Sequence, residues 1–180
     1  MQVIYPPISN EDWSGFHVFL AGSIEMGQAA DWQQSLINSL SDLSDDLILM
    51  NPRRKDWDSS WIQSIDNINF KQQVDWELSH LESADLAVFY FDPKTKAPIT
   101  LMELGLCCGR GEPQSVVCCP EGYWRRGNVE ILCNKSEITF LDNLDQLSKH
   151  IREEFVEYET DLNTMIERYK AMLVDLENGV

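Results

Sequence analysis

Two glutamates, Glu77 and Glu103, are the side chains whose positions in the sequence best suit chemistry. Glu103 comes after a continuous apolar segment at residues 86–91, which predicts a strand buried on both faces. Open α/β folds place their ligands just beyond the carboxyl ends of such strands. Glu77 lies at the edge of the apolar face of a predicted helix, with no Lys or Arg three or four residues away to pair with it. Two carboxyl groups in one cleft are the minimum for breaking a glycosidic bond through a covalent sugar intermediate.

Glu103 also has a purely structural interpretation. Thr100 and Glu103 have the spacing of a capping box, in which the acid accepts a hydrogen bond from the backbone amide of the N-cap residue. As a nucleophile, Glu103 would have to be ionised near neutral pH. Burial and a like-charged neighbour raise the pKa of a carboxyl group, whereas a place in the first turn of a helix lowers it. The sequence leaves both interpretations open.

The elements that must position these acids begin with a strand at residues 17–21. Gly22, Ser23 and Ile24 follow it as a tight turn. A helix comes next, with apolar residues at helical spacing: Trp32, Leu36, Leu40 and Leu43. The glycine lets the backbone approach a ligand, and the amides at the start of the helix attract a phosphate or a sugar hydroxyl. This segment predicts the first half of a βαβ unit.

The rest of the chain predicts alternating strands and helices. Further strands are expected at residues 47–50, 86–91, 115–119 and 137–141, and helices at residues 69–83, from Thr100 onward and at residues 128–133. The first of these helices has a predicted buried stripe of Phe70, Val74, Leu78 and Leu81. Residues 51–68 form a long connection containing Trp57 and Trp61, which predicts either a surface flap packed on the domain or a loop that covers a ligand.

Length and charge exclude several classes of function. A chain of 180 residues with 43% hydrophobic residues is long enough for one well-packed globular domain. A formal net charge of −16 argues against binding a nucleic acid polymer or an anionic membrane surface. Basic residues at 53–55 and 125–126 still allow a local anion site. No apolar segment is long enough to cross a bilayer and no signal peptide is evident, so we expect a cytoplasmic protein.

The cysteines and histidines do not predict a metal or redox site. The five cysteines lie in apolar segments without a CxxC spacing, so we expect buried, reduced thiols. His17, His80 and His150 are scattered, and each is expected to be structural or exposed. Because no set of His, Cys and carboxylate residues has ligand spacing, we expect no cofactor.

The C-terminal segment has a different pattern from the rest of the chain. Apolar residues alternate at spacings of four and three, as in a heptad seam: Ile151, Phe155, Tyr158, Leu162, Met165, Tyr169, Met172 and Leu176. This pattern predicts a long helix that pairs with the same helix of a second subunit, giving a homodimer or larger homo-oligomer. The alternative is a helix folded back on its own domain.

Six short segments occur in an order that resembles the nucleoside 2-deoxyribosyltransferase-like family, including its nucleotide N-glycosidase branch. They are FLAGSI (19–24), NPRR (51–54), WEL (76–78), AD (84–85), MELG (102–105) and GNVE (127–130). The resemblance covers about residues 16–140 and is fairly specific as a set. It implies a Rossmann-like, flavodoxin-type three-layer α/β sandwich with a five-stranded, mainly parallel sheet. We therefore expect an extended lead-in (1–15), an α/β nucleoside-binding catalytic domain (16–141) and a C-terminal amphipathic helix (142–180).

The resemblance also implies roles for particular residues. Glu103 matches the nucleophile that forms the glycosyl-enzyme, and Glu77 takes the place of an aspartate that contacts the sugar and assists proton transfer. The expected substrate-binding residues are Gly22, Ser23, Ile24, Asn51, Arg53, Asp92 and Asn128. Residues 53–55 either bind a 5′-phosphate or form a solvated basic loop. Phe19 and Ala97 depart from the family, which usually has an aromatic hydroxyl and a polar residue at those two places.

Two functions follow from the resemblance. The first is an enzyme that cleaves the N-glycosidic bond of a (deoxy)nucleoside or its monophosphate, passing the sugar from Glu103 to water or to a second base. The second is a nucleotide-binding or sensing module of the same fold with weak or no turnover. The presence of both Glu77 and Glu103 favours the enzyme, whereas Phe19 and Ala97 favour the binding module.

Overall fold

The computed structural model describes residues 1–8, 14–24 and 29–177, with side chains described as far as residue 173. Its elements alternate along the chain: β1 (Gln2–Ile4), β2 (Phe16–Gly22), α1 (Trp32–Ser39), β3 (Leu47–Met50), α2 (Ile68–Ser83), β4 (Leu86–Tyr90), α3 (Pro98–Arg110), β5 (Gln114–Cys118), α4 (Arg126–Lys135), β6 (Thr139–Leu141) and α5 (Leu144–Glu177). The chain divides into two compact units, Met1–Ser148 and Lys149–Val180, which we describe separately.

The first unit is built on one parallel sheet with the strand order β1-β3-β2-β4-β5-β6. From β3 to β6 this is the flavodoxin-type order, in which the chain reverses direction across the sheet between β2 and β4. Ligands of such folds bind outside the carboxyl ends of the strands at this switch point. Here Gly22 and Tyr90 are paired at that end of β2 and β4.

The sheet has six strands, so the prediction of five is wrong by one edge strand. Gln2–Ile4, within the expected lead-in, pairs in parallel with β3. Three residues followed by Pro6 and Pro7 are too short to show the alternation by which a strand is recognised from sequence. The tertiary pairing with β3 alone makes this segment a strand.

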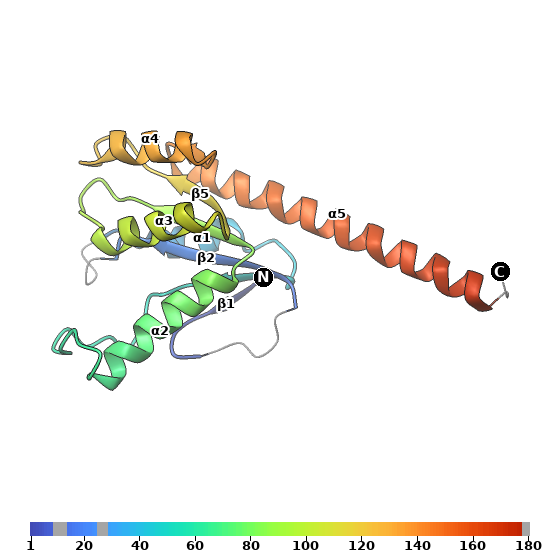
Figure 1. Cartoon of the computed structure of the whole chain (residues 1–180), viewed down its shortest axis with the longest axis horizontal. Coiled ribbons are helices and arrows are strands. Elements are labelled where there is room, and N and C mark those ends of the chain that lie inside the picture. Colours follow the sequence, from blue (N-terminus) through green and yellow to red (C-terminus); the bar gives the residue numbers. More distant parts are fainter. Residues whose placement is uncertain (9–13, 25–28, 178–180) are drawn as a thin grey trace. The chain divides into compact units, whose positions relative to one another are not determined.

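Helices cover both faces of the sheet, as the continuous apolar strands require. Figure 1 shows α2, α3 and α4 side by side, and the apolar residues of all three belong to one core cluster with Phe19, Phe89 and Val117 of the strands. α1 packs on the opposite face, where Trp32 stacks on Tyr90 with ring centroids 4.9 Å apart. Alternate residues of β4 therefore face the two helical layers.

The buried face of α2 differs from the predicted stripe. Of the four predicted residues only Leu81 is fully buried; the other buried residues of α2 are Gln73, Trp76 and His80. Trp76 contacts Phe19 of β2 and stacks on His80, with ring centroids 6.2 and 4.0 Å apart. The buried face is rotated from the predicted one because the large Trp76 ring fills the space above the sheet better than Val74 or Leu78 would. Trp76 Nε1 also donates a hydrogen bond to Ile8 O.

α5 is the long helix that ends at the C-terminus in Figure 1. In its second-unit part, Ile151 and Phe155 are buried, whereas the described side chains from residue 160 to residue 173 are all exposed. Among the described residues, no helix combines the length and the apolar character that crossing a bilayer requires.

Candidate active site

The start of α3 tests the capping-box interpretation of Glu103. The helix begins at Pro98, and its N-cap is Ala97 in the left-handed conformation (φ 47°) without a side-chain cap. Proline suits this position, because its missing N–H has no helical partner there. Thr100 lies inside the helix and is buried, so it is not the N-cap residue and the capping box does not form. The capping-box interpretation is wrong.

Glu103 lies instead on the inward face of α3, where the buried residues are Thr100, Glu103, Leu104 and Cys107. Only 6% of the residue is exposed. It is one turn too far along the helix for the N-terminal dipole to favour its charge strongly. Burial, and then the charge of Glu77, raise the pKa of Glu103 to about 8.

Glu77 is half-buried on α2 and is held by a neighbour that the sequence analysis did not single out. Gln73 Nε2 donates to Glu77 Oε1 at 2.8 Å and to Pro52 O at 2.9 Å. Burial raises the pKa of Glu77 to about 7, and the hydrogen bond from Gln73 offsets part of this rise. The separation of four residues on one helix, which places two side chains together, was the available signal for Gln73.

The structure brings Glu77 and Glu103 together from different helices. Their pKa values of about 7 and about 8 mean that Glu77 ionises first, and its charge then opposes ionisation of Glu103. Near neutral pH the pair therefore retains a proton. Such a pair can supply one carboxylate and one acid at the same pH.

The turn after β2 is fixed by packing. A Cβ on Gly22 would lie 2.5 Å from the Trp32 ring and 2.8 Å from Tyr90 O, so the glycine is required for this contact. Ser23 Oγ accepts hydrogen bonds from Asp92 N at 3.1 Å and Thr95 Oγ1 at 2.7 Å. Ile24 is half-buried, and the next four residues lie outside the described part of the chain. The turn is thus joined rigidly to the loop after β4.

Asp92 completes this connection at the switch point. Its carboxylate accepts from Lys94 N at 2.8 Å and from Ala30 N at 3.2 Å, and the residue is buried. Thr95 Oγ1 also contacts Asp92 O at 3.0 Å. Ser23, Asp92 and Thr95 therefore form one polar cluster between the carboxyl ends of β2 and β4. Sequence reasoning missed Thr95, whose place in a loop gave no periodic signal.

Asn51 and Arg53 lie at the carboxyl end of β3. Asn51 Oδ1 accepts from Arg53 N at 3.0 Å, and the Arg53 side chain turns toward the start of α1. There Arg53 Nε donates to Gln33 Oε1 at 2.9 Å, and its guanidinium lies 3.3 Å from the Asp31 carboxylate. Arg53 is thus engaged in joining β3 to α1.

Asn128 lies on α4, apart from the hydrogen bonds that join the other predicted residues. It is exposed on α4, and its backbone N donates to Arg125 O at 2.9 Å. Within the described residues, none of its hydrogen bonds joins it to another member of the predicted site.

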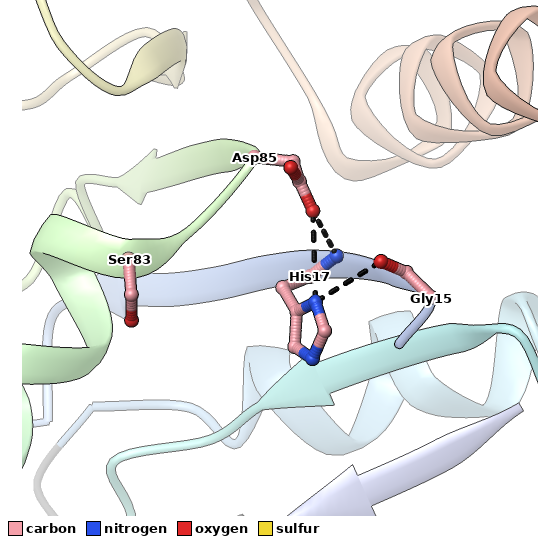
Figure 2. A pocket seen from close by; sticks show the side chains of 4 residues that line it. All are labelled: Gly15, His17, Ser83 and Asp85. Atoms are coloured by element: carbon pink, nitrogen blue, oxygen red, sulfur yellow. Dashed lines mark hydrogen bonds and ion pairs between the residues drawn. The ribbon is translucent and has the colours of Figure 1, made fainter. Parts of the chain in front are cut away.

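Two surface hollows have described linings that include neither Glu77 nor Glu103. A hollow of about 350 Å³ is lined by Gly15, His17, Ser83 and Asp85, at the amino ends of β2 and β4 (Figure 2). Another of about 570 Å³ is lined by the loop before α2 and by α2 itself, including Trp76 next to Glu77.

Among the described residues, no group of three or more His, Cys, Asp or Glu side chains is arranged to hold a metal ion. The described cysteines are free thiols, four buried and Cys108 half-buried. Burial raises the pKa of Cys118 and of Cys133 to about 12, which keeps these thiols protonated and unreactive.

The first unit is a parallel, doubly wound sheet of flavodoxin-type order, with Glu77 and Glu103 on the helices that precede and follow β4. The chain belongs to the nucleoside 2-deoxyribosyltransferase-like family, whose sequence model matches residues 15–123. This match includes both glutamates and the predicted substrate-binding residues except Asn128.

A solved structure shows the same fold. It is a conserved protein from Enterococcus faecalis V583, which superposes with a TM-score of 0.56 at 13% sequence identity. The superposition covers 78% of this chain and 99% of that one. Among curated proteins, none matches the chain.

Proposed function

We propose that the protein cleaves the N-glycosidic bond of a (deoxy)nucleoside or nucleoside monophosphate, with Glu103 as the nucleophile and Glu77 as the proton carrier. The proposal rests on two carboxyl groups from neighbouring helices, buried Glu103 on α3 and half-buried Glu77 on α2, whose pKa values are both raised, that of Glu103 partly by the charge of Glu77. The family to which the chain belongs gives the substrate class.

The proposed reaction has two steps. With the shared proton on Glu77, ionised Glu103 forms a bond to C1′ as the bond from C1′ to the base nitrogen breaks, and the base leaves with that proton. Water or a second base then attacks C1′, releases Glu103 and returns a proton to the pair. The first step needs Glu103 ionised and Glu77 protonated; in the second, Glu103 is bonded to C1′ and the ionised Glu77 accepts the proton of the attacking water or base.

Gln73 is a positioning residue in this proposal. Its Nε2 holds one oxygen of Glu77 and also bonds to the backbone after β3, so it fixes the carboxyl group relative to the sheet. Gln73 Oε1 is buried without a hydrogen-bond partner among the described residues. A sugar hydroxyl or a base amino group could donate to that oxygen.

A panel of deoxynucleosides, ribonucleosides and their monophosphates tests the proposal, with free base measured by chromatography. Glu103→Gln should lower base release by at least about a thousandfold, as expected for loss of a nucleophile. Glu112→Gln, which changes an exposed glutamate just beyond the same helix, is the matched control and should keep full activity. Release that persists in Glu103→Gln would disprove the nucleophile assignment.

A binding or sensing module is the second candidate, and the 6% exposure of Glu103 favours it. Phe19, which lacks a hydroxyl, packs against Trp76, and Ala97 is buried as the N-cap of α3. In this case the wild type releases no base, but one of the nucleotides raises its melting temperature. Base release by the wild type decides for the enzyme.

A further inference from the structure

The second half of α5 has an apolar stripe that the described chain leaves open. Six side chains are 37% to 65% exposed on the turns between residues 162 and 173: Leu162, Met165, Ile166, Tyr169, Met172 and Leu173. In heptad terms Leu162 and Tyr169 are at position a, Met165 and Met172 at d, and Ile166 and Leu173 at e. A stripe at a, d and e is that of a helix which buries one whole face.

The opposite face of this helix is polar. Lys170 pairs with Glu167 at 2.8 Å, three residues apart on the outer side, and Thr164 Oγ1 donates to Thr160 O at 2.9 Å. Helices in proteins take most of their stability from packing an amphipathic face, and monomers rarely expose a continuous apolar patch of this kind. We therefore expect another helix or protein surface to cover this stripe.

The charged residues beside the stripe indicate that its partner is a second copy of the same helix. The g positions that flank the stripe hold Asp161 and Arg168, which have opposite charges and lie seven residues apart. When two copies of this helix run antiparallel about a two-fold axis near Leu162 and Met165, Asp161 of each copy faces Arg168 of the other. In a parallel pair the same two side chains would face Ile166 and Leu173 and leave both charges beside apolar groups.

We propose that residues 158–173 of α5 form an antiparallel helix pair with a second copy of this chain. Leu162 of one copy packs against Met165 of the other at the centre, and two symmetric pairs of Asp161 with Arg168 set the direction. The arrangement is isologous, so it closes at two copies. It does not depend on the proposed glycosidase activity, because no residue of the interface belongs to the glutamate site.

Sedimentation of the full chain at micromolar concentration tests the interface. The wild type should sediment as a dimer, and Met165→Glu, which puts a charge in the centre of the stripe, should shift it to monomer. Thr164→Glu, one residue away on the polar face, is the control and should remain dimeric. A monomeric wild type, or a Met165→Glu variant that dimerises as the wild type does, would overturn the proposal.

The direction of the helices has its own test. Asp161→Arg places two arginines opposite each other at both ends of the pair and should weaken dimerisation roughly tenfold. The double variant Asp161→Arg/Arg168→Asp should restore it, whereas Glu157→Arg, on the outer face, should change little. Circular dichroism confirms that each variant stays helical. A dimer that is indifferent to Asp161→Arg would rule out the antiparallel arrangement.

Discussion

The two ends of the central strands hold ionisable groups in opposite ways. At the amino end, Asp85 Oδ2 accepts a hydrogen bond from His17 N at 2.7 Å and lies 3.6 Å from His17 Nδ1 (Figure 2). Burial would raise the pKa of Asp85, but the hydrogen bonds from His17 outweigh it and lower the pKa. Beside the carboxyl end, burial raises the pKa values of both Glu77 and Glu103, and the charge of Glu77 raises that of Glu103 further.

This contrast distinguishes a structural contact from a candidate site. A carboxylate that receives hydrogen bonds is stabilised in its charged form and stabilises the fold. Ionisation of a carboxyl pair with raised pKa values destabilises the folded state. Groups with strongly shifted pKa values cluster at functional sites. At the amino end, the contact between Asp85 and His17 therefore joins the start of β4 to β2, and the carboxyl end holds the candidate reaction centre.

The contrast predicts opposite pH dependences of stability, and this is the largest expected effect. Glu77 and Glu103 hold protons in the folded state at pH values where the unfolded chain has lost them, so the free energy of unfolding should fall as pH rises from about 4.5 to about 8. Asp85, with a lowered pKa, contributes stability that is lost only as the pH falls below its usual range.

Urea denaturation at pH 5 and pH 9 measures this effect. The wild type should be clearly less stable at pH 9 than at pH 5, because each pKa unit corresponds to about 1.4 kcal/mol and the pKa values of both glutamates are raised by more than two units. Glu77→Gln/Glu103→Gln should remove most of the loss, and Glu112→Gln should not. A double variant with the wild-type slope would show that the pair is not the source.

Gly22→Ala probes the packing that fixes the carboxyl end. The added methyl group would overlap Trp32 and the backbone of β4, so the free energy of unfolding should fall by about 2 kcal/mol. Gly105→Ala on α3, where a Cβ meets nothing within 4 Å, is the control and should be neutral or stabilising. Equal stabilities of the two variants would argue against the Trp32 contact.

Asp85→Ala removes the hydrogen bond between His17 N and the Asp85 carboxylate at the amino end. The hydrogen bond from β2 to a charged group at the start of β4 is lost, so the free energy of unfolding should fall by about 1.5 kcal/mol. Base release should be unchanged apart from the loss of folded protein. Glu121→Ala, in an exposed loop, serves as the control, and a drop in specific activity of folded Asp85→Ala would contradict the division between the two ends.

Gln73→Leu is expected to have the smallest effect, and it sharpens the proposed role of Glu77. Loss of the hydrogen bond from Gln73 should raise the pKa of Glu77, so the acidic limb of the activity profile should move up by less than about one pH unit. Gln72→Leu, its exposed neighbour, should leave the profile in place. An unchanged limb in Gln73→Leu would remove Gln73 from the site.

Local sequence predicted the strands better than the helix faces. β3 begins and ends where expected, and β2, β4 and β5 lie within one residue of prediction at each end, because continuous apolar segments bounded by turn residues have few other uses. The face of α2 was wrong, since Trp76 and His80 are buried by stacking that no periodicity reveals. The capping box at Thr100 failed because Pro98 starts the helix earlier.

The candidate site was predictable only in part. The two acids stood out because Glu103 follows a buried strand and Glu77 has no ion-pair partner on its own helix. The roles of Ser23 and Asp92 as partners of each other and of Thr95 could not be predicted, because their hydrogen bonds join residues about 70 positions apart. The same holds for the sixth strand, which exists only by pairing with β3.

The sequence by itself determined the alternation of strands and helices and the identity of the two acids, because both depend on residue types over short stretches. Only the tertiary structure decided that Glu77 and Glu103 share an environment that raises both pKa values, since burial and the approach of α2 to α3 depend on the packing of the whole core.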